Sequence, residues 1–185
     1  MTWAADRGEN DFKRLALAVS KYWVCKRWPG HAAEALECLG GNGYVEESGM
    51  PRLFRESPLN GIWEGSGNVA ALDLLRAMMK EPQTVEAFFG EVELAAGAST
   101  HLDTAVDEVK KSLGDLATIE LRARRVAEQM ALVLQGSLLV RHAVPAVADA
   151  FCASRLGGDY GHAYGTLPPG VDLAPIIERA TPKVG

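Results

Sequence analysis

The first third of the chain alternates apolar and polar side chains at the spacing of an α-helix. Its apolar stripe recurs at steps of three and four and consists of Phe12, Leu15, Val19, Tyr22 and Trp23. The positions between them carry the charged face, with Lys13, Arg14, Lys21 and Arg27. This period places the two sets on opposite sides of a helix. We therefore predict an amphipathic helix after a frayed lead-in over residues 1–10.

Two breaks interrupt this first helical pattern. Pro29-Gly30 is expected to kink or break the helix before the apolar pattern resumes over residues 32–39. Gly40 then stands where a helix ends on a residue of positive φ, which glycine adopts without strain. Pro51 suits the first turn of a further short helix.

The second half also has helical periodicity. One stripe comprises Leu102, Ala105, Val106, Val109 and Leu113. A second, assigned to one long helix, comprises Leu116, Ile119, Ala123, Val126, Met130 and Val133. Pro82 and residues 95–100 predict turns, and the tail from Gly157 predicts irregular structure with a short helix over 176–179. No stretch alternates with period two over several strands, so we predict an all-α fold.

Composition and charge narrow the class of protein. The chain is 48% apolar, enough for a sizeable core. Residues 1–80 carry 10 basic and 10 acidic side chains, whereas residues 81–185 carry 9 and 14, so the net charge of −5 lies in the second half. That balance disfavours nucleic-acid binding as the main function, although Arg122, Arg124 and Arg125 leave a local DNA-binding patch open.

Cysteine and histidine usage gives no metal or disulfide pattern. Cys25, Cys38 and Cys152 have no pair at metal or redox spacing, and the four histidines are scattered singly. The longest apolar run, over residues 130–140, is too short to cross a bilayer. We therefore expect a reduced, cytoplasmic protein with neither a metal site nor a membrane segment.

A glycine-rich bend over residues 62–68, with the sequence Ile-Trp-Glu-Gly-Ser-Gly-Asn, comes directly before an apolar helical stretch. A carboxylate at Glu64 on such a bend can point into a cleft, and the free amides at the start of the following helix can bind an anionic or polar ligand. The alternative is structural: Ser66 or Asn68 caps the helix, and Glu64 lies in water.

The spacing of several motifs resembles a known family. Leu39-Gly40-Gly41-Asn42-Gly43-Tyr44, Arg52, Arg55-Glu56, residues 62–66 and Leu75-Arg76 follow the order of the C-terminal helical domain of flavin-dependent acyl-CoA dehydrogenases. Cys25-Lys26-Arg27, Glu46-Glu47-Ser48 and residues 63–68 most resemble its AidB-like, alkylation-response branch. The close resemblance covers about the first eighty residues.

The resemblance implies a role for each part of the two glycine-rich segments. Glu64 would remove the α-proton of an acyl-CoA thioester while a hydride leaves the β-carbon for FAD. The residues implied to contact FAD are Gly40, Gly41, Ile62, Trp63, Gly65, Ser66, Gly67 and Asn68. Gly40 and Gly41 would meet the adenosine end of an FAD held mainly by a neighbouring subunit. Glu37, where the family usually has Gln, is left out because its charge would repel a phosphate.

The same resemblance implies a division of the chain and a need for partners. Residues 1–80 correspond to the helical core with the FAD and catalytic loops, and residues 81–185 to an additional helical region packed on it. The family's N-terminal helical domain and β-domain have no counterpart here, so we expect a homo-oligomer or a partner chain to complete the site. Two alternatives remain: a non-catalytic helical oligomerisation module, and a DNA-associated alkylation-protection protein.

Overall fold

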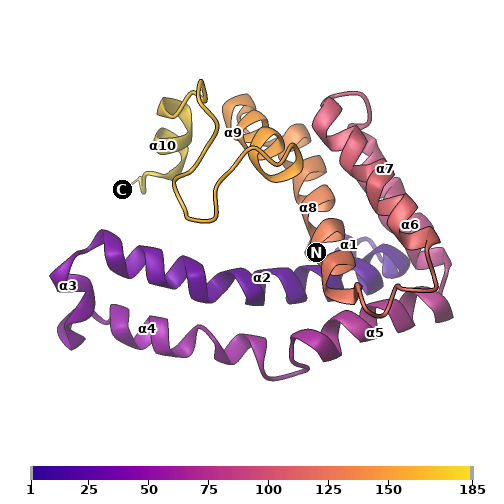
Figure 1. Ribbon diagram of the computed structural model, residues 1–185, viewed down its shortest axis with the longest axis horizontal. Helices are drawn as coiled ribbons and strands as arrows, with labels where there is room; N and C mark the ends of the chain where they lie inside the picture. Colours follow the sequence, from indigo (N-terminus) through magenta and orange to yellow (C-terminus); the bar gives the residue numbers. More distant parts are fainter. Residues whose placement is uncertain (1, 184–185) are drawn as a thin grey trace. The chain divides into compact units, whose positions relative to one another are not determined.

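The computed structural model describes residues 2–183, and over this range the chain is helical with no strand (Figure 1). The elements are α1 (Thr2–Asp6), α2 (Asn10–Cys38), α3 (Gly41–Tyr44), η1 (Glu46–Ser48), α4 (Met50–Glu56), η2 (Leu59–Gly61), α5 (Gly67–Lys80), α6 (Gln83–Val92), η3 (Glu93–Ala95), α7 (Thr100–Gly114), α8 (Ala123–His142), α9 (Pro145–Phe151), the π-helical turn η4 (Cys152–Leu156) and α10 (Ala174–Ala180). The all-α prediction is confirmed.

The described chain divides into two compact units. The first holds the residues up to Phe88 together with Leu116–Glu128, and the second holds Phe89–Asp115 and the residues from Gln129 onwards. The boundary thus falls inside α6 and α8, and the predicted division at residue 80 remains a prediction.

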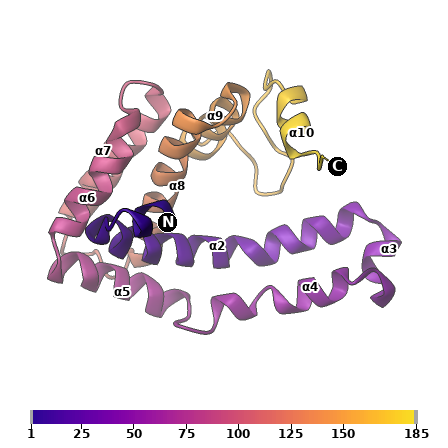
Figure 2. The same cartoon turned by 180° about the vertical axis from the view of Figure 1, so that it is seen from behind.

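The first unit is built around the long helix α2. Helices α4 and α5 run back along it, as both ribbon views show (Figures 1 and 2). The predicted stripe is buried at Phe12, Leu15, Val19 and Tyr22, and it packs with Ala71, Leu74, Leu75 and Ala77 of α5 in the core of this unit. Burying such side chains is the main stabilising contribution to a helix pair.

Helix α2 continues through Pro29 without a break. Because proline has no N–H, the carbonyl of Cys25 one turn earlier receives no helical hydrogen bond from it. That carbonyl oxygen lies 3.8 Å from the position a Cβ atom of Gly61 would take. Of the two outcomes predicted at Pro29-Gly30, the break is therefore wrong and the kink stays a prediction; the packing of α2 against its neighbours holds the helix together across the proline.

Two other predictions about element boundaries are wrong. The lead-in contains the helix α1 and buries Ala4, so it is not frayed over residues 2–6; Met1 lies outside the described residues. The stretch from Leu116 to Ile119 is not helical, and α8 begins only at Ala123. Leu116 is 71% exposed, so its three-residue step to Ile119 gives no buried face to stabilise a helix there.

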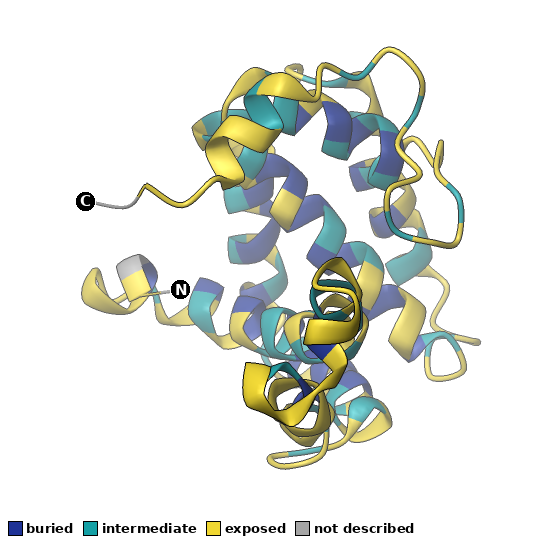
Figure 3. Cartoon of the chain, turned by 90° about the vertical axis from the view of Figure 1, so that its left-hand side faces the viewer, coloured by how far each residue is buried: buried dark blue, intermediate teal, exposed yellow. Residues whose placement is uncertain are grey.

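The second unit packs α7, α8 and the turn η4. The stripe predicted for α7 is buried at Leu102, Val106 and Val109. A Cβ atom at Gly136 of α8 would lie 2.9 Å from Leu156 and 3.2 Å from Leu102, so a glycine there allows close packing. The short helix predicted in the tail is confirmed as α10. In both units, helices carry buried residues on one side and exposed residues on the other (Figure 3).

Within residues 2–183, none of the helices is both long enough and apolar enough to cross a membrane. The three cysteines are free, and burial raises the pKa of the Cys152 thiol.

Candidate functional site

The bend before α5 has an unusual backbone. Glu64 has φ 57°, and it is the one non-glycine residue with positive φ in the range that the structure describes. Gly65 follows with φ 109°. A left-handed conformation at a non-glycine residue costs about 1–3 kcal/mol and persists only where the surroundings enforce it. Such strain is typical of functional positions, which makes this bend the centre of the candidate site.

The side chain of Lys21 holds this bend from α2. Its ammonium donates to the carbonyl oxygen of Trp63 at 2.9 Å and to that of Gly65 at 3.0 Å. Hydrogen bonds from a charged donor are worth about 1.5–3 kcal/mol each, less when partly exposed as here. Their sum is of the same order as the strain at Glu64, so Lys21 can offset it.

A cavity of about 590 Å³ lies within the first unit beside the bend, and Glu64 is one of its lining residues. The other lining residues come from α2 and from α5 with its C-terminal cap: Asn10, Asp11, Lys13, Arg14, Leu17, Ala18, Lys21, Val69, Ala70, Asp73 and Glu81. Its lining combines apolar side chains with side chains of both signs of charge, a combination common in sites for amphipathic small molecules. Glu64 itself is exposed, so its carboxylate is free to meet a ligand.

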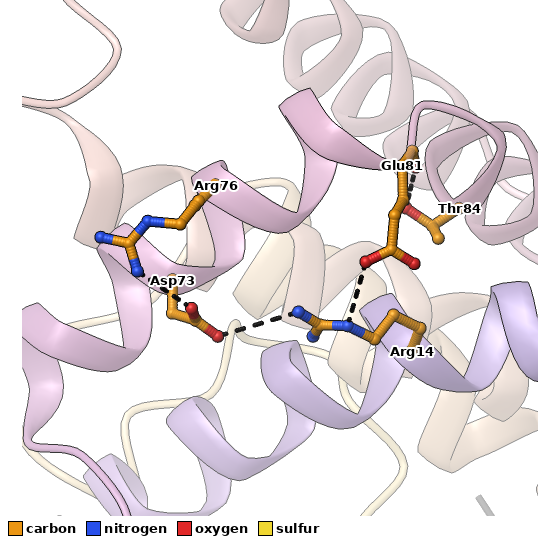
Figure 4. A network of polar contacts seen from close by, with 5 residues as sticks. All are labelled: Arg14, Asp73, Arg76, Glu81 and Thr84. Atoms are coloured by element: carbon orange, nitrogen blue, oxygen red, sulfur yellow. Dashed lines mark hydrogen bonds and ion pairs between the residues drawn. The ribbon is translucent and has the colours of Figure 1, made fainter.

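A network of polar contacts fixes the two helices that line this cavity (Figure 4). Arg14 of α2 lies between Glu81, at 3.6 Å, and Asp73 of α5, at 4.0 Å. Asp73 also accepts a hydrogen bond from Arg76, one turn further along α5, at 3.3 Å. The Thr84 hydroxyl donates to the backbone carbonyl of Glu81. These contacts hold α2 and α5 in register below the bend.

The start of α5 presents unused hydrogen-bond donors. Ser66 occupies the N-cap position, but its hydroxyl makes no capping hydrogen bond, so the structural alternative of a serine cap is not realised. A Cβ atom at Gly67 would lie 2.8 Å from the Lys26 ammonium and 3.9 Å from the guanidinium carbon of Arg124. Free amides, a hydroxyl and two cations at one helix start suit an anionic ligand.

Gly40 and Gly41 lie elsewhere in the first unit. Gly40 has φ 59°, which confirms the predicted helix end, and neither glycine would bring a Cβ atom within 4 Å of another group. At 1.5 Å of rise per residue, the end of α2 lies about 20 Å from Lys26, which marks the start of α5. The structure therefore brings residues 62–68 together with the cavity but does not bring the Gly40 turn to the same place.

The aromatic and apolar residues of the bend face outward. Ile62 is 64% and Trp63 57% exposed, and neither lines the cavity. Their exposure leaves them available to a cofactor or to another polypeptide.

The charged segment between the two bends is held by ion pairs. Arg55 makes a bidentate pair with Glu46, at 2.8 and 3.1 Å, and Arg52 pairs with Glu56 at 3.0 Å. The hydrogen bond from Arg55 lowers the pKa of Glu46, and the same bond raises the pKa of Arg55. These charges therefore hold the segment in place, and the bidentate partner of Arg55 is Glu46 and not its neighbour Glu56.

Sequence reasoning missed three cations that shape the site. The helical period places Lys21 only on the charged face of α2, and no pattern places Lys26 or Arg124 near the start of α5. One face of α2 carries four cavity-lining residues at steps of three and four: Arg14, Leu17, Ala18 and Lys21. This spacing is a sequence signal that could have placed Lys21 at the cavity. No sequence signal connects Arg124 with α2, where its guanidinium donates to the Tyr22 hydroxyl at 3.3 Å.

Among residues 2–183 no cluster of three or more histidine, cysteine or acidic side chains has the arrangement of a metal site.

Known proteins are similar to this chain both over its first 79 residues and over most of its length. Residues 1–79 match the family described as acyl-CoA dehydrogenase, C-terminal domain. The chain is 38% identical over 148 residues to the putative acyl-CoA dehydrogenase AidB of Escherichia coli (strain K12), covering 80% of this chain and 27% of that protein. It is 30% identical over 179 residues to acyl-CoA dehydrogenase family member 11 of Caenorhabditis elegans, covering 86% and 28%.

A solved structure has a similar fold. The crystal structure of Caenorhabditis elegans ACDH-11 in complex with C11-CoA superposes with a TM-score of 0.67 at 28% identity, covering 80% of this chain and 30% of that one. The chain therefore spans less than a third of the length of each of these three relatives.

Proposed function

We propose that residues 1–79, which match the acyl-CoA dehydrogenase C-terminal domain family, supply the catalytic base and part of the flavin site of an AidB-like enzyme that oxidises acyl-CoA thioesters. The observation that carries the proposal is Glu64, a carboxylate held in a left-handed backbone conformation at a cavity of about 590 Å³. The family resemblance and the strained geometry fall on the same residue.

Glu64 would take the α-proton of the bound thioester. A general base must come within about 3 Å of the proton it removes, and its carboxylate works best when water is excluded around it. Glu64 is exposed in this chain. The surface that desolvates it would therefore come from the substrate and from polypeptide outside this chain, which agrees with the small share of its relatives that the chain spans.

The residues at the start of α5 fit the polar part of a flavin dinucleotide. Ser66 keeps its hydroxyl free, the first amides of α5 have no side-chain cap, and Lys26 and Arg124 add positive charge beside Gly67. Together with Ile62, Trp63, Gly65 and Asn68, these groups would hold FAD. The flavin, when bound, would accept the hydride equivalent that leaves the β-carbon.

The Gly40 turn would serve a second molecule of the cofactor. Because Gly40 and Gly41 lie about 20 Å along α2 from the start of α5, they would approach the adenosine end of an FAD held by a neighbouring subunit. Their open surroundings allow another molecule to come close to the backbone. This assignment requires an oligomer or a partner chain.

The experiment that tests the proposal is the visible absorption spectrum of the purified chain mixed with FAD. We expect the absorption of a bound flavin, and we expect an acyl-CoA to bleach it. One acyl-CoA to test is C11-CoA, the ligand in the Caenorhabditis elegans structure. The other is isovaleryl-CoA, after which two further relatives, the isovaleryl-CoA dehydrogenases of rice and Arabidopsis thaliana, are named. In Glu64→Gln the bound flavin should stay oxidised, so its absorption should not bleach. Glu86→Gln, on an exposed position of α6, is the matched control and should bleach normally.

Two results would contradict the proposal. Bleaching of Glu64→Gln at the rate of the unchanged chain would remove Glu64 as the base. A complex of this chain with a partner chain that supplies the missing domains, if it stays colourless at saturating FAD, would remove the flavin-binding assignment from these residues. The DNA-associated and non-catalytic alternatives are not favoured by the relationships found.

A further inference from the structure

We propose that Lys21 is the positioning residue for Glu64: through two hydrogen bonds to the bend, its ammonium sets the direction of the catalytic carboxylate. This inference rests on the proposed role of Glu64 as the base. It adds a residue on a different helix, 43 positions earlier in the chain, to the machinery of that site.

The two carbonyls that accept from Lys21 bracket the strained part of the backbone. The Trp63 carbonyl belongs to the peptide group before Glu64, and the Gly65 carbonyl belongs to the peptide group after Gly65. Between them lie the backbone dihedrals of only two residues, and both of these residues have positive φ. One ammonium therefore fixes the peptide groups at both ends of this two-residue segment. In doing so it also fixes the direction in which the Glu64 side chain leaves the backbone.

The position of Lys21 on α2 is itself well fixed. Lys21 lies on the charged face of α2, and the adjacent apolar stripe is buried at Val19 and Tyr22. The helix therefore cannot rotate about its axis without exposing these two side chains. Two turns earlier on the same face, Arg14 ties α2 to Asp73 of α5 and to Glu81 (Figure 4). Lys21 thus connects the bend to a rigid support.

An ordinary solvent-exposed lysine would not make these contacts. Lys13 offers the comparison, since it lies on α2 and lines the same cavity but makes no hydrogen bond to the bend. The difference between the two lysines is therefore the pair of bonds and not the charge in the cavity. Because a displacement of about 1 Å in a reacting group can lower a rate about 100-fold, a loosened bend would matter for catalysis.

The test measures the conformation of Glu64 directly, without cofactor. In the ¹³C,¹⁵N-labelled 185-residue chain, the Cα and Cβ chemical shifts of Glu64 report its backbone dihedrals. We expect Lys21→Met to move the shifts of Glu64 and Gly65 away from left-handed values, and Lys13→Met to leave them unchanged. Unchanged shifts in Lys21→Met would overturn the proposal. If Lys21→Met does not fold, Lys21→Gln, which removes the charge but keeps one donor group, serves for the same measurement.

A second readout comes from turnover in the flavin-loaded protein. Lys21→Met should lower kcat about 100-fold with KM changed less than about threefold, and Lys21→Arg should restore most of the activity because it retains charged donors. Equal losses in Lys21→Met and Lys13→Met would overturn the positioning role. The two hypotheses fail separately: an active Glu64→Gln removes the base, whereas unmoved Glu64 shifts remove Lys21 and leave the base in place.

Discussion

The two glycine-rich bends of the first unit each place a residue at a positive φ, but they do so with different residues. In the bend after α2 this residue is Gly40, with φ 59° and ψ −141°, whereas in the bend before α5 it is Glu64, with φ 57°. Glycine adopts this conformation without steric cost, and glutamate does not. The first bend is therefore relaxed and the second is strained.

The difference shows where the chain gives up stability. Around Gly40 the backbone needs no support, and a side chain added there would meet nothing within 4 Å. At Glu64 the strain is offset by Lys21, which donates to the carbonyls of Trp63 and Gly65 at the two ends of the strained segment. A strained residue with its own support indicates that the carboxylate is needed at that place.

The largest effect is expected inside the relaxed bend, at Gly43. A Cβ atom there would lie 2.1 Å from the backbone oxygen of Leu36 and 3.1 Å from the Cβ of Leu39, so α2 or α3 must shift to accept it. We expect Gly43→Ala to lower the free energy of unfolding by about 2–3 kcal/mol in urea denaturation. A loss below about 0.5 kcal/mol would show that α3 is not held against α2.

A smaller effect is expected at Gly40, where a Cβ atom would strain the backbone but would meet no other group within 4 Å. Gly40→Ala should cost about 1–2 kcal/mol because alanine is strained at φ 59°. Gly41→Ala is the matched control, since that position has ordinary φ and equal space around it, and it should be neutral or slightly stabilising. If both variants lower the free energy of unfolding equally in the same urea titration, the positive φ at Gly40 is not the cause of its loss of stability.

The strained bend should respond in the opposite direction. Asparagine tolerates the left-handed region better than glutamate, so Glu64→Asn should raise the free energy of unfolding by about 0.5–1 kcal/mol while abolishing bleaching of the flavin. Thermal unfolding of the variant beside Glu64→Gln, which keeps the strain, separates backbone relief from loss of charge. A variant no more stable than Glu64→Gln would show that the bend carries no strain.

The smallest effect is expected from the Glu46–Arg55 pair that follows the first bend. Its hydrogen bond lowers the pKa of Glu46 in the folded chain below the ordinary 4.5, so its stabilisation is complete above pH 4.5 and is lost as the pH falls through the lowered value. Glu46→Gln should therefore lower Tm slightly at neutral pH, and this difference should shrink as the pH falls below 4.5. A difference in Tm that persists in acid would contradict the pair as its cause.

Much of the first unit follows from local sequence patterns. The stripe from Phe12 to Tyr22 predicted α2 because buried apolar side chains must recur on one helix face. Gly40 predicted the end of that helix, and Pro51 predicted the start of α4, because each residue has a restricted or unusually free backbone. The position of Glu64 before a helix also followed from the pattern, whereas its catalytic role came from the resemblance and remains a prediction.

The contacts between distant residues could not be predicted in the same way. Nothing local indicates that Lys21 reaches the bend, that Arg55 prefers Glu46 to Glu56, or that α2 survives Pro29. These outcomes depend on which helices pack together, and a lysine on a charged face looks the same in sequence whether it meets water or a carbonyl. The helix wrongly extended to Leu116 has the same cause, because a repeating step predicts a helix only when a partner covers its face.

The left-handed conformation of Glu64 also makes this position a marker for evolutionary drift. Selection for folding alone favours glycine or asparagine there, and only selection for catalysis opposes them. A lineage that loses the activity should therefore replace this glutamate early, gaining stability as it does so, while Lys21 becomes free to change after it. The residue found at this one bend would then distinguish working enzymes from relatives that keep the fold for another purpose.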